Sequence, residues 1–354
     1  MNRNFVDKDM SHKLFGEIDL NDVFFDSLKQ DYPNFEKWFH SKQKEKAYVQ
    51  YNDKGALEGF LFLKMEYGII DDISPSIKAD KILKIGTFKV NAHGSKIGER
   101  FIKIITDIAI SENCDLCYVT IFPKHENLIK LVTKFGFIEY GKKHTNGVLE
   151  NVYVKNMKEI RKNILQDFPL INTYNVNKYL ISIYPKYHTL LFADSILSTE
   201  NREILKDISY TNSIHKIYVT NMDLKDLKAN DILVIYRTKE SWGKAEYTSV
   251  ATSIGVVEEI RSQNDFDNFE DFYKYACQYS VFDKDDLKKW YDKNNECKAI
   301  KFTYNVAFKK RITRRDLIEN IGLSRNAYWG FFKISDTQFK NIIEFSEINR
   351  NIII

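Results

Sequence analysis

The sequence predicts an α/β (α+β) fold in which a mixed sheet with flanking helices is followed by a small β-barrel domain with added helices. Its 354 residues are enough for about two domains. In the first half, a hairpin leads into alternating strands and helices, an order typical of a compact mixed-sheet domain. In the second half, short strands are separated by helices. We therefore expect a first domain over residues 1–157, a linker over 158–178 and a second domain over 179–354.

Apolar periodicity and turn residues define the elements of the first half. Pro33 divides a helical segment, Asp53-Lys54-Gly55 joins two alternating apolar runs as a hairpin, and Gly136 ends a helix as a C-cap. The expected elements are helix 21–43, strands 46–52, 57–66 and 82–90, helix 97–110, strand 116–122, helix 125–135, and strands 137–140 and 148–155.

The second half gives shorter and more widely spaced signals, which favour a decorated barrel. The expected strands are 215–220, 231–237, 249–260 and 299–304. The expected helices are 198–206, 268–279, 284–293, 314–321 and 335–345.

Composition narrows the class of protein. Hydrophobic residues make up 44% of the chain, which argues against a disordered protein, and the net charge of +4 permits a nucleic-acid partner without demanding one. The N-terminus lacks the apolar core of a signal peptide, and no run of about 18 apolar residues could cross a bilayer. We therefore expect a cytoplasmic protein with no membrane partner. Cys114 and Cys117 form a CxxC pair, but the other two cysteines stand alone, which favours buried thiols over a metal site.

The strongest functional signal lies between Lys84 and Glu99. An apolar strand runs into the polar turn His93-Gly94-Ser95-Lys96, and a helix begins at Ile97-Gly98. The N–H groups of such a turn and of the first helical turn point at one spot, and the helix dipole makes that spot attractive to anions. The pattern predicts a pyrophosphate-binding turn, although any strand–turn–helix connection would also use small polar residues.

Over residues 20–157, the order of elements around this turn resembles the GCN5-related N-acetyltransferases, which take acetyl groups from acetyl-coenzyme A. The family's signature is Arg or Gln, two residues, Gly, one residue, then Gly or Ala. Gly98 matches the last position, His93 replaces Arg or Gln, and Lys96 replaces the first Gly. The resemblance implies acetyl-CoA as cofactor and a strand that splays from its neighbour so that its backbone pairs with pantetheine. The implied cofactor-binding residues are Phe88, Val90, His93, Gly94, Ser95, Lys96, Ile97 and Gly98.

The family's second motif is a helix that ends in Gly-Phe, which Gly136-Phe137 matches. A Tyr one turn earlier often protonates the leaving thiolate in that family, but Val132 stands there, and His125 stands at the usual Asn. A catalytic base must also take a proton from the acceptor amine. We expect the acid and base among His125, Glu66 and Tyr140, with Asp71, Asp72 and Tyr118 as further candidates. A solvated carboxylate, a helix-start histidine or a packing tyrosine is the alternative for each.

In the second half, the runs 230–236 (NDILVIY) and 253–258 (SIGVVE) resemble two strands of the PUA-like superfamily, which includes ASCH and EVE domains. Such domains commonly bind RNA or modified bases. A dense basic cluster is followed by Tyr328-Trp329 and Phe331-Phe332, and Trp242 lies in a loop beside lysines. Charges beside aromatic faces suit single-stranded nucleic acid, although a solvated helix start is the alternative. The expected nucleic-acid-binding residues are Trp242, Lys309, Lys310, Arg311, Arg314 and Arg315.

Together the two resemblances predict an acetyl-CoA-dependent N-acetyltransferase. Its acceptor would be an RNA-linked amine, on tRNA or aminoacyl-tRNA, selected by the second domain, and this expectation rests on fold analogy. The alternative is an RNA-binding regulatory protein with a degenerate, non-catalytic acetyltransferase scaffold, which Lys96 and Val132 favour. A protein acetyltransferase with a partner-binding second domain is a third hypothesis.

Overall fold

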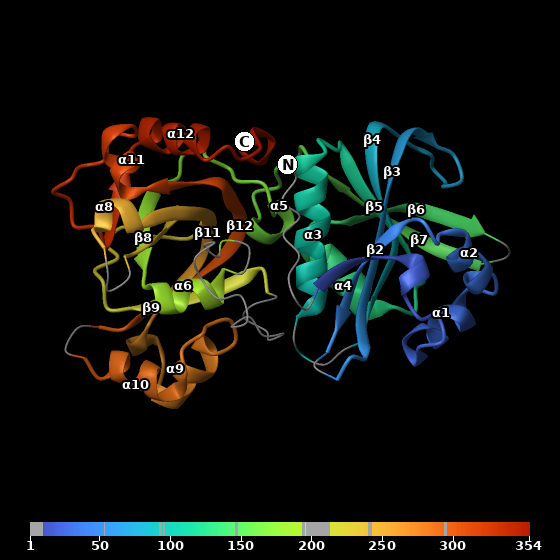
Figure 1. The fold of residues 1–354 in the computed structure, drawn as a ribbon, viewed down its shortest axis with the longest axis horizontal. Coiled ribbons are helices and arrows are strands. Elements are labelled where there is room, and N and C mark those ends of the chain that lie inside the picture. The colour runs from blue at the N-terminus through green and yellow to red at the C-terminus, as the bar shows by residue number, and fades with distance from the viewer. Residues whose placement is uncertain are drawn as a thin grey trace. The chain divides into compact units, whose positions relative to one another are not determined.

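The computed structural model describes residues 10–52, 54–91, 94, 96–145, 148–192, 195, 213–239, 243–293 and 296–354. The chain divides into two compact units, Met1–Lys158 and Glu159–Ile354 (Figure 1). The predicted helix 198–206 and the predicted site residues His93, Ser95 and Trp242 lie outside the described residues.

The first unit is built on a mixed seven-stranded sheet with the order β1-β2-β3-β4-β5-β7-β6. Neighbouring strands are antiparallel except β4 and β5, which are parallel. The strands are β1 Met10–Leu14, β2 Lys46–Tyr51, β3 Leu57–Ile70, β4 Ile77–Val90, β5 Leu116–Ile121, β6 Ile138–Thr145 and β7 Val148–Asn156. The β3–β4 hairpin is longer than predicted, because pairing continues from Gly59↔Val90 out to Ile70↔Ile77.

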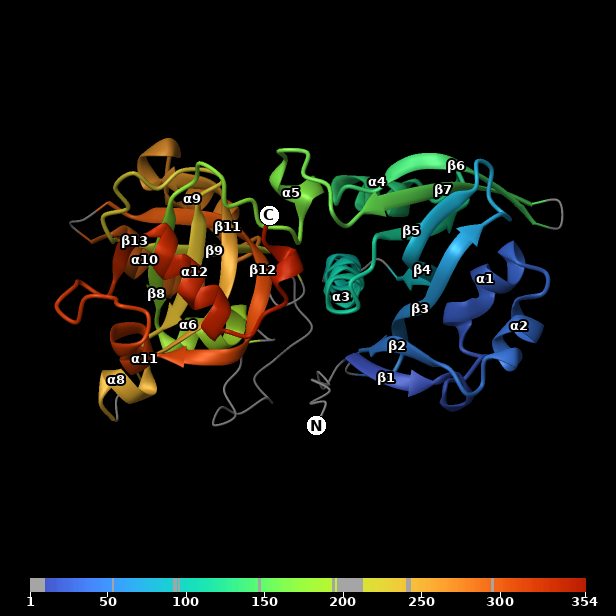
Figure 2. The same ribbon diagram turned by 90° about the horizontal axis from the view of Figure 1, so that it is seen from above.

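Helices cover both faces of this sheet, as Figure 2 shows. On one face lie η1 Phe15–Glu17, η2 Val23–Phe25, α1 Asp26–Asp31 and α2 Phe35–Ser41. Their aromatic side chains, such as Phe25 and Phe39, pack on Phe60 and form a buried cluster. On the other face lies α3 Ile97–Ser111, followed after β5 by α4 Glu126–Lys134. The predicted helix 21–43 is thus three short segments: η2 continues directly into α1, and Pro33 separates α1 from α2.

The second unit contains a mixed six-stranded sheet with the order β13-β8-β10-β11-β12-β9. The strands are β8 Lys178–Ile183, β9 His215–Thr220, β10 Ile232–Arg237, β11 Val250–Ser262, β12 Lys298–Thr313 and β13 Phe331–Ile334. β8 and β10 are parallel, and the other pairs are antiparallel. Among the described residues β9 and β13 are the two edges and do not pair with each other, so the predicted closed barrel is replaced by an open sheet.

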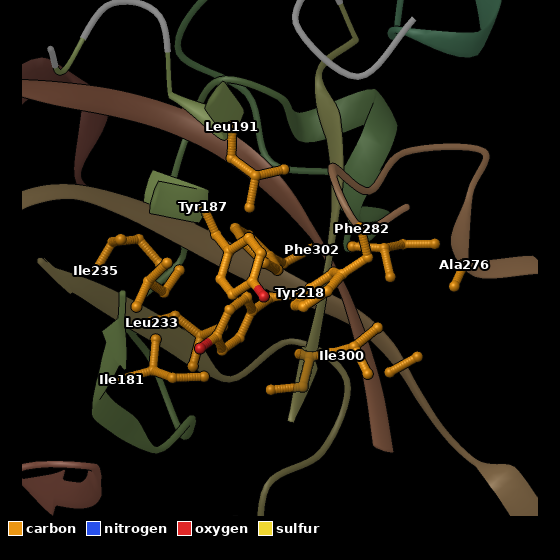
Figure 3. Close-up of a cluster of buried hydrophobic side chains, with 14 of the residues drawn as sticks. Ile181, Tyr187, Leu191, Tyr218, Leu233, Ile235, Ala276, Phe282, Ile300 and Phe302 are labelled. Atoms are coloured by element: carbon orange, nitrogen blue, oxygen red, sulfur yellow. The ribbon is translucent and has the colours of Figure 1, made fainter. Parts of the chain in front are cut away.

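The core of the second unit lies between this sheet and its helices. Figure 3 shows side chains of α6, among them Tyr187 and Leu191, against residues of β8, β9, β10 and β12. The helical segments are α5 Ile164–Asp167, α6 Pro185–Leu191, α8 Ala245–Thr248, η5 Gln263–Asp265, α9 Phe269–Ala276, α10 Lys284–Tyr291, α11 Arg314–Glu319, α12 Asp336–Phe345 and η6 Arg350–Ile352. Phe168 and Ile171, within the segment predicted as a linker, are fully buried, and Ile171 pairs with Ile353.

Candidate functional site

The backbone of the first unit opens where β4 and β5 separate. The parallel pairing of these strands runs from Ile82↔Leu116 to Ile85↔Val119 and stops there. Beyond it, residues 87–90 of β4 pair only with β3. The β3–β4 register shifts at Gly86, which is a β-bulge, and a bulge bends its strand. One edge of β4 therefore presents backbone N–H and C=O groups that have no strand partner among the residues that the structure describes.

A cavity of about 760 Å³ lies along this edge. Its volume is in the range of small-molecule sites. Four predicted site residues line it: Phe88, Val90, Gly98 and His125. The other lining residues are Ser27, Leu28, Asp31, Lys89, Asn91, Lys124, Glu126, Asn127, Leu128 and Leu131. The wall thus combines the end of β4, the start of α3, the start of α4 and one side of α1.

Two residues before α3 adopt the left-handed backbone conformation. Lys96 is the N-cap residue and adopts the left-handed conformation with φ of 65°, and Gly94 has φ of 87°. Gly98 lies against α4, since a Cβ there would be 2.8 Å from Leu131 Cδ2. Helix packing alone therefore explains this glycine. The Ile97 side chain is buried against Gly59 rather than facing the cavity, so it can contribute only its backbone.

Asp31 joins the predicted His125 at the cavity. Its carboxylate lies 3.1 Å from His125 Nε2 and also pairs with Lys124. The Asp31 side chain is 8% exposed, whereas the His125 side chain is 42% exposed. Lys89, also in the wall, donates to Ser27, and burial lowers the pKa of Lys89 although Asp31 and Asp26 act in the opposite direction. Sequence reasoning missed Asp31 because no local pattern links α1 to the helix that begins after β5.

Glu66 and Tyr140 lie away from this cavity wall. Burial acts to raise the pKa of Glu66, but a 2.6 Å hydrogen bond from Tyr118 and the charges of Lys84 and Lys64 outweigh it and lower that pKa. A carboxylate held in this way is a weaker base. Tyr140 is on β6 and donates to the Ser76 carbonyl at 2.9 Å. Their catalytic roles stay predictions.

Val132, at the position of the family's tyrosine, is fully buried. The cavity-facing residues of α4 are instead Glu126, Asn127, Leu128 and Leu131.

In the second unit, the predicted basic residues lie on the end of β12 and the start of α11. Lys309 and Lys310 are exposed on the strand, and Lys310 Nζ lies 4.1 Å from the Phe345 ring centroid. Arg314 stacks on Trp329 at 4.4 Å, and Arg315 pairs with Glu319 at 2.8 Å. The remaining predicted residue, Arg311, is half-buried and contributes to the field at His188. Tyr328 nearby is strongly exposed.

Neither the cysteines nor a metal-binding cluster contributes to the cavity among the described residues. Cys114 and Cys117 are buried, and burial raises the pKa of the Cys114 thiol to about 11. Within the described ranges, no group of three or more His, Cys, Asp or Glu residues could hold a metal ion. No helix in those ranges is long and apolar enough to cross a membrane.

No protein-family model and no curated protein matches this sequence. Among solved structures, the chain is similar to ASCH from Zymomonas mobilis (9% identity, 48% of this chain and 94% of that one, TM-score 0.34). It is also similar to arylalkylamine N-acetyltransferase 2 from Aedes aegypti (12% identity, 42% of this chain and 98% of that one, TM-score 0.32). A GNAT-family acetyltransferase from Streptococcus agalactiae is similar to the same degree (14% identity, 43% of this chain and 96% of that one, TM-score 0.31).

Proposed function

We propose that the first unit binds acetyl-coenzyme A and transfers its acetyl group to an amine. The observation that carries this proposal is the unpaired edge of β4 along the 760 Å³ cavity. Pantetheine carries two amides, and an extended chain with amides completes a strand edge by main-chain hydrogen bonds. Phe88 and Val90 lie on that edge, and Phe88 is held by Phe101 of α3 at 5.4 Å between ring centroids.

The start of α3 supports a diphosphate at one end of the same cavity. The first N–H groups of a helix are not used within it, and the macrodipole places partial positive charge there. The 15-residue α3 supplies both, and Gly98 leaves its first turn without a side chain at the cavity wall. Lys89 and Lys124 add positive charge to the wall. Together these groups suit a ligand with an anionic end and an amide-rich arm.

Bound acetyl-CoA supplies a thioester that an amine attacks directly, so no enzyme nucleophile is needed. His125 can exchange protons with the reacting groups at the cavity, because its imidazole is partly exposed there. Asp31 fixes the ring by its contact with Nε2, which leaves Nδ1 for the reactants.

Calorimetric titration with acetyl-CoA tests this function. Leu128→Trp narrows the cavity and should weaken binding at least about tenfold, whereas Lys130→Trp, on the exposed side of the same helix, should not. A wild-type chain that takes up neither acetyl-CoA nor CoA at millimolar concentration would refute the proposal.

The second unit favours RNA as the carrier of the acceptor amine. Lys309 and Lys310 are exposed next to α11, and Arg315 lies 5.9 Å from the ring of the exposed Tyr247. Exposed cations beside aromatic faces bind single strands, with an affinity that falls steeply with salt. Incubation with labelled acetyl-CoA and total tRNA tests the acceptor directly. The buried Val132 favours the alternative, an RNA-binding protein with a non-catalytic first unit, and that alternative predicts RNA binding without acetyl transfer.

A further inference from the structure

Glu150 on β7 is a buried carboxylate with an unusual set of partners. It is 5% exposed, and its Oε1 accepts a 2.7 Å hydrogen bond from Tyr32 and a 3.0 Å hydrogen bond from Thr120. Both donors are neutral hydroxyls. In the described part of the chain no lysine, arginine or histidine pairs with Glu150, and no donor reaches Oε2. By contrast, Glu99, which is also a buried glutamate of this unit, has Lys134 Nζ at 3.3 Å.

A cation that arrives from outside would be a third and stronger partner for this carboxylate. Removing a carboxylate from water costs free energy, which an ion partner or several donors must offset. Two hydroxyl groups on one oxygen offset part of it and leave the second oxygen available. They also fix the carboxylate in one orientation, because Tyr32 at the end of α1 and Thr120 on β5 approach from different elements. Oε2 can therefore accept from one further donor without disturbing the two hydrogen bonds at Oε1.

The carboxylate lies beside the opening between β4 and β5. Thr120 is the first residue of β5 beyond its last pairing with β4, Ile85↔Val119. Tyr32 directly follows Asp31, which lines the cavity. The Tyr32 ring also lies 5.0 Å from Phe122, whose ring is 5.9 Å from His125. Tyr32 and Thr120 therefore connect Glu150 to the cavity wall and to the point where β4 and β5 separate.

We propose that Glu150 binds the acceptor as an alkylammonium ion, so that the substrate class is a primary alkylamine; this inference rests on the proposed acetyl transfer. Oε2 accepts an N–H of the ammonium and then takes that proton, which gives a neutral amine and a protonated Glu150. The amine nitrogen forms a C–N bond to the thioester carbonyl carbon while the C–S bond breaks. The second amine proton passes through His125 to the departing thiolate, and Glu150 returns its proton to water.

Glu150→Gln tests this assignment, because it keeps the shape and an acceptor for Tyr32 and Thr120 but removes the charge. The probes are butylamine, 1,4-diaminobutane and 2-phenylethylamine, each with the alcohol of the same shape, titrated without CoA. We expect wild type to bind at least one amine more tightly than its alcohol. In E150Q the ratio of the two affinities, amine to alcohol, should fall at least tenfold. Glu139→Gln, at an exposed carboxylate of the same unit, is the matched control. Amines that bind E150Q as well as wild type, or bind neither, would overturn the inference.

A separate titration with acetyl-CoA keeps the two proposals distinguishable. Acetyl-CoA should bind E150Q within twofold of wild type, since Glu150 does not line the 760 Å³ cavity. If wild type binds amines through Glu150 but takes up no acetyl-CoA, the cation site stands and the proposed acetyl transfer fails. If wild type acetylates the amines and E150Q does so at an unchanged rate with an unchanged pH profile, the transfer stands and the role of Glu150 fails.

Discussion

Acidification should destabilise the second unit through His188. This residue of α6 is fully buried, and its Nε2 lies 2.8 Å from Thr252 Oγ1. Burial, together with the charges of Arg237 and Arg311, holds the pKa of His188 well below the ordinary value of 6.5. Its Nδ1 has no hydrogen-bond partner among the described residues. The native state therefore keeps a neutral imidazole at pH values where the unfolded chain binds a proton.

The sign and the size of the effect follow from this difference. Stability is complete above the unfolded pKa of 6.5 and is lost as the pH falls toward the lower native pKa, because only the unfolded state gains a proton there. Between pH 7.5 and pH 5.5, the proton-bound fraction of the unfolded histidine rises from about a tenth to about nine tenths, which costs about 1.4 kcal/mol of unfolding free energy. Each further pH unit costs about the same until the native imidazole titrates.

Urea unfolding at the two pH values measures this loss in wild type, His188→Gln and the exposed His144→Gln. Other groups titrate as well, so the informative quantity is the difference between variants. The pH-dependent loss of wild type should exceed that of H188Q by about 1.4 kcal/mol, and H144Q should follow wild type. Equal losses in wild type and H188Q would show that the folded and unfolded states bind the His188 proton equally well, so that burial does not shift the pKa of this residue.

Three further predictions concern the candidate sites. Gly98→Val should destabilise the first unit by about 1–3 kcal/mol, because its Cβ meets Leu131, and Leu131→Ala in the same chain should restore part of the loss in a thermal melt. Asp31→Asn should lower the acetyl-transfer rate by about tenfold or more without changing acetyl-CoA affinity; an unchanged rate contradicts a positioning role. Charge reversal at Lys309 and Lys310 should weaken RNA binding and reduce the salt slope by about 0.7 for each phosphate that these lysines neutralise, whereas a slope equal to that of wild type excludes this surface.

The part of the site that sequence could predict is the part that local connections assemble. β4 and β5 are parallel neighbours, so their carboxyl ends lie at the same edge of the sheet, and each is followed directly by a helix. Phe88, Val90, Gly98 and His125 come together at one cavity for that reason. The signals that revealed them, an apolar strand, a small-residue turn and a helix start, are all short and continuous in the chain.

Contacts between distant segments could not be predicted in the same way. In the second unit, apolar alternation after Phe302 fades into polar residues, and the sequence gives no reason to extend the strand to Thr313. Tertiary pairing of β12 with β11 provides that reason, since it continues to Val250↔Thr313. Lys309 and Lys310 consequently lie on a strand. The open edges of this sheet could not be predicted either. Whether β9 and β13 pair depends on the order of the strands in space, and short apolar runs in the sequence do not specify that order.

The candidate bases differ in the side chains that contact their carboxylates, and only the fold shows those contacts. Position along the chain favours Glu66, which precedes the cofactor strand. In the fold, Lys64 and Lys84 neutralise Glu66 and Tyr118 binds it, so its charge is already satisfied. Glu150 lies far along the chain on β7, yet it is the buried carboxylate that receives only hydroxyl donors within the described residues. Because a base must have an oxygen available to a proton, the partners of each carboxylate identify Glu150 as the group able to meet an incoming ammonium ion.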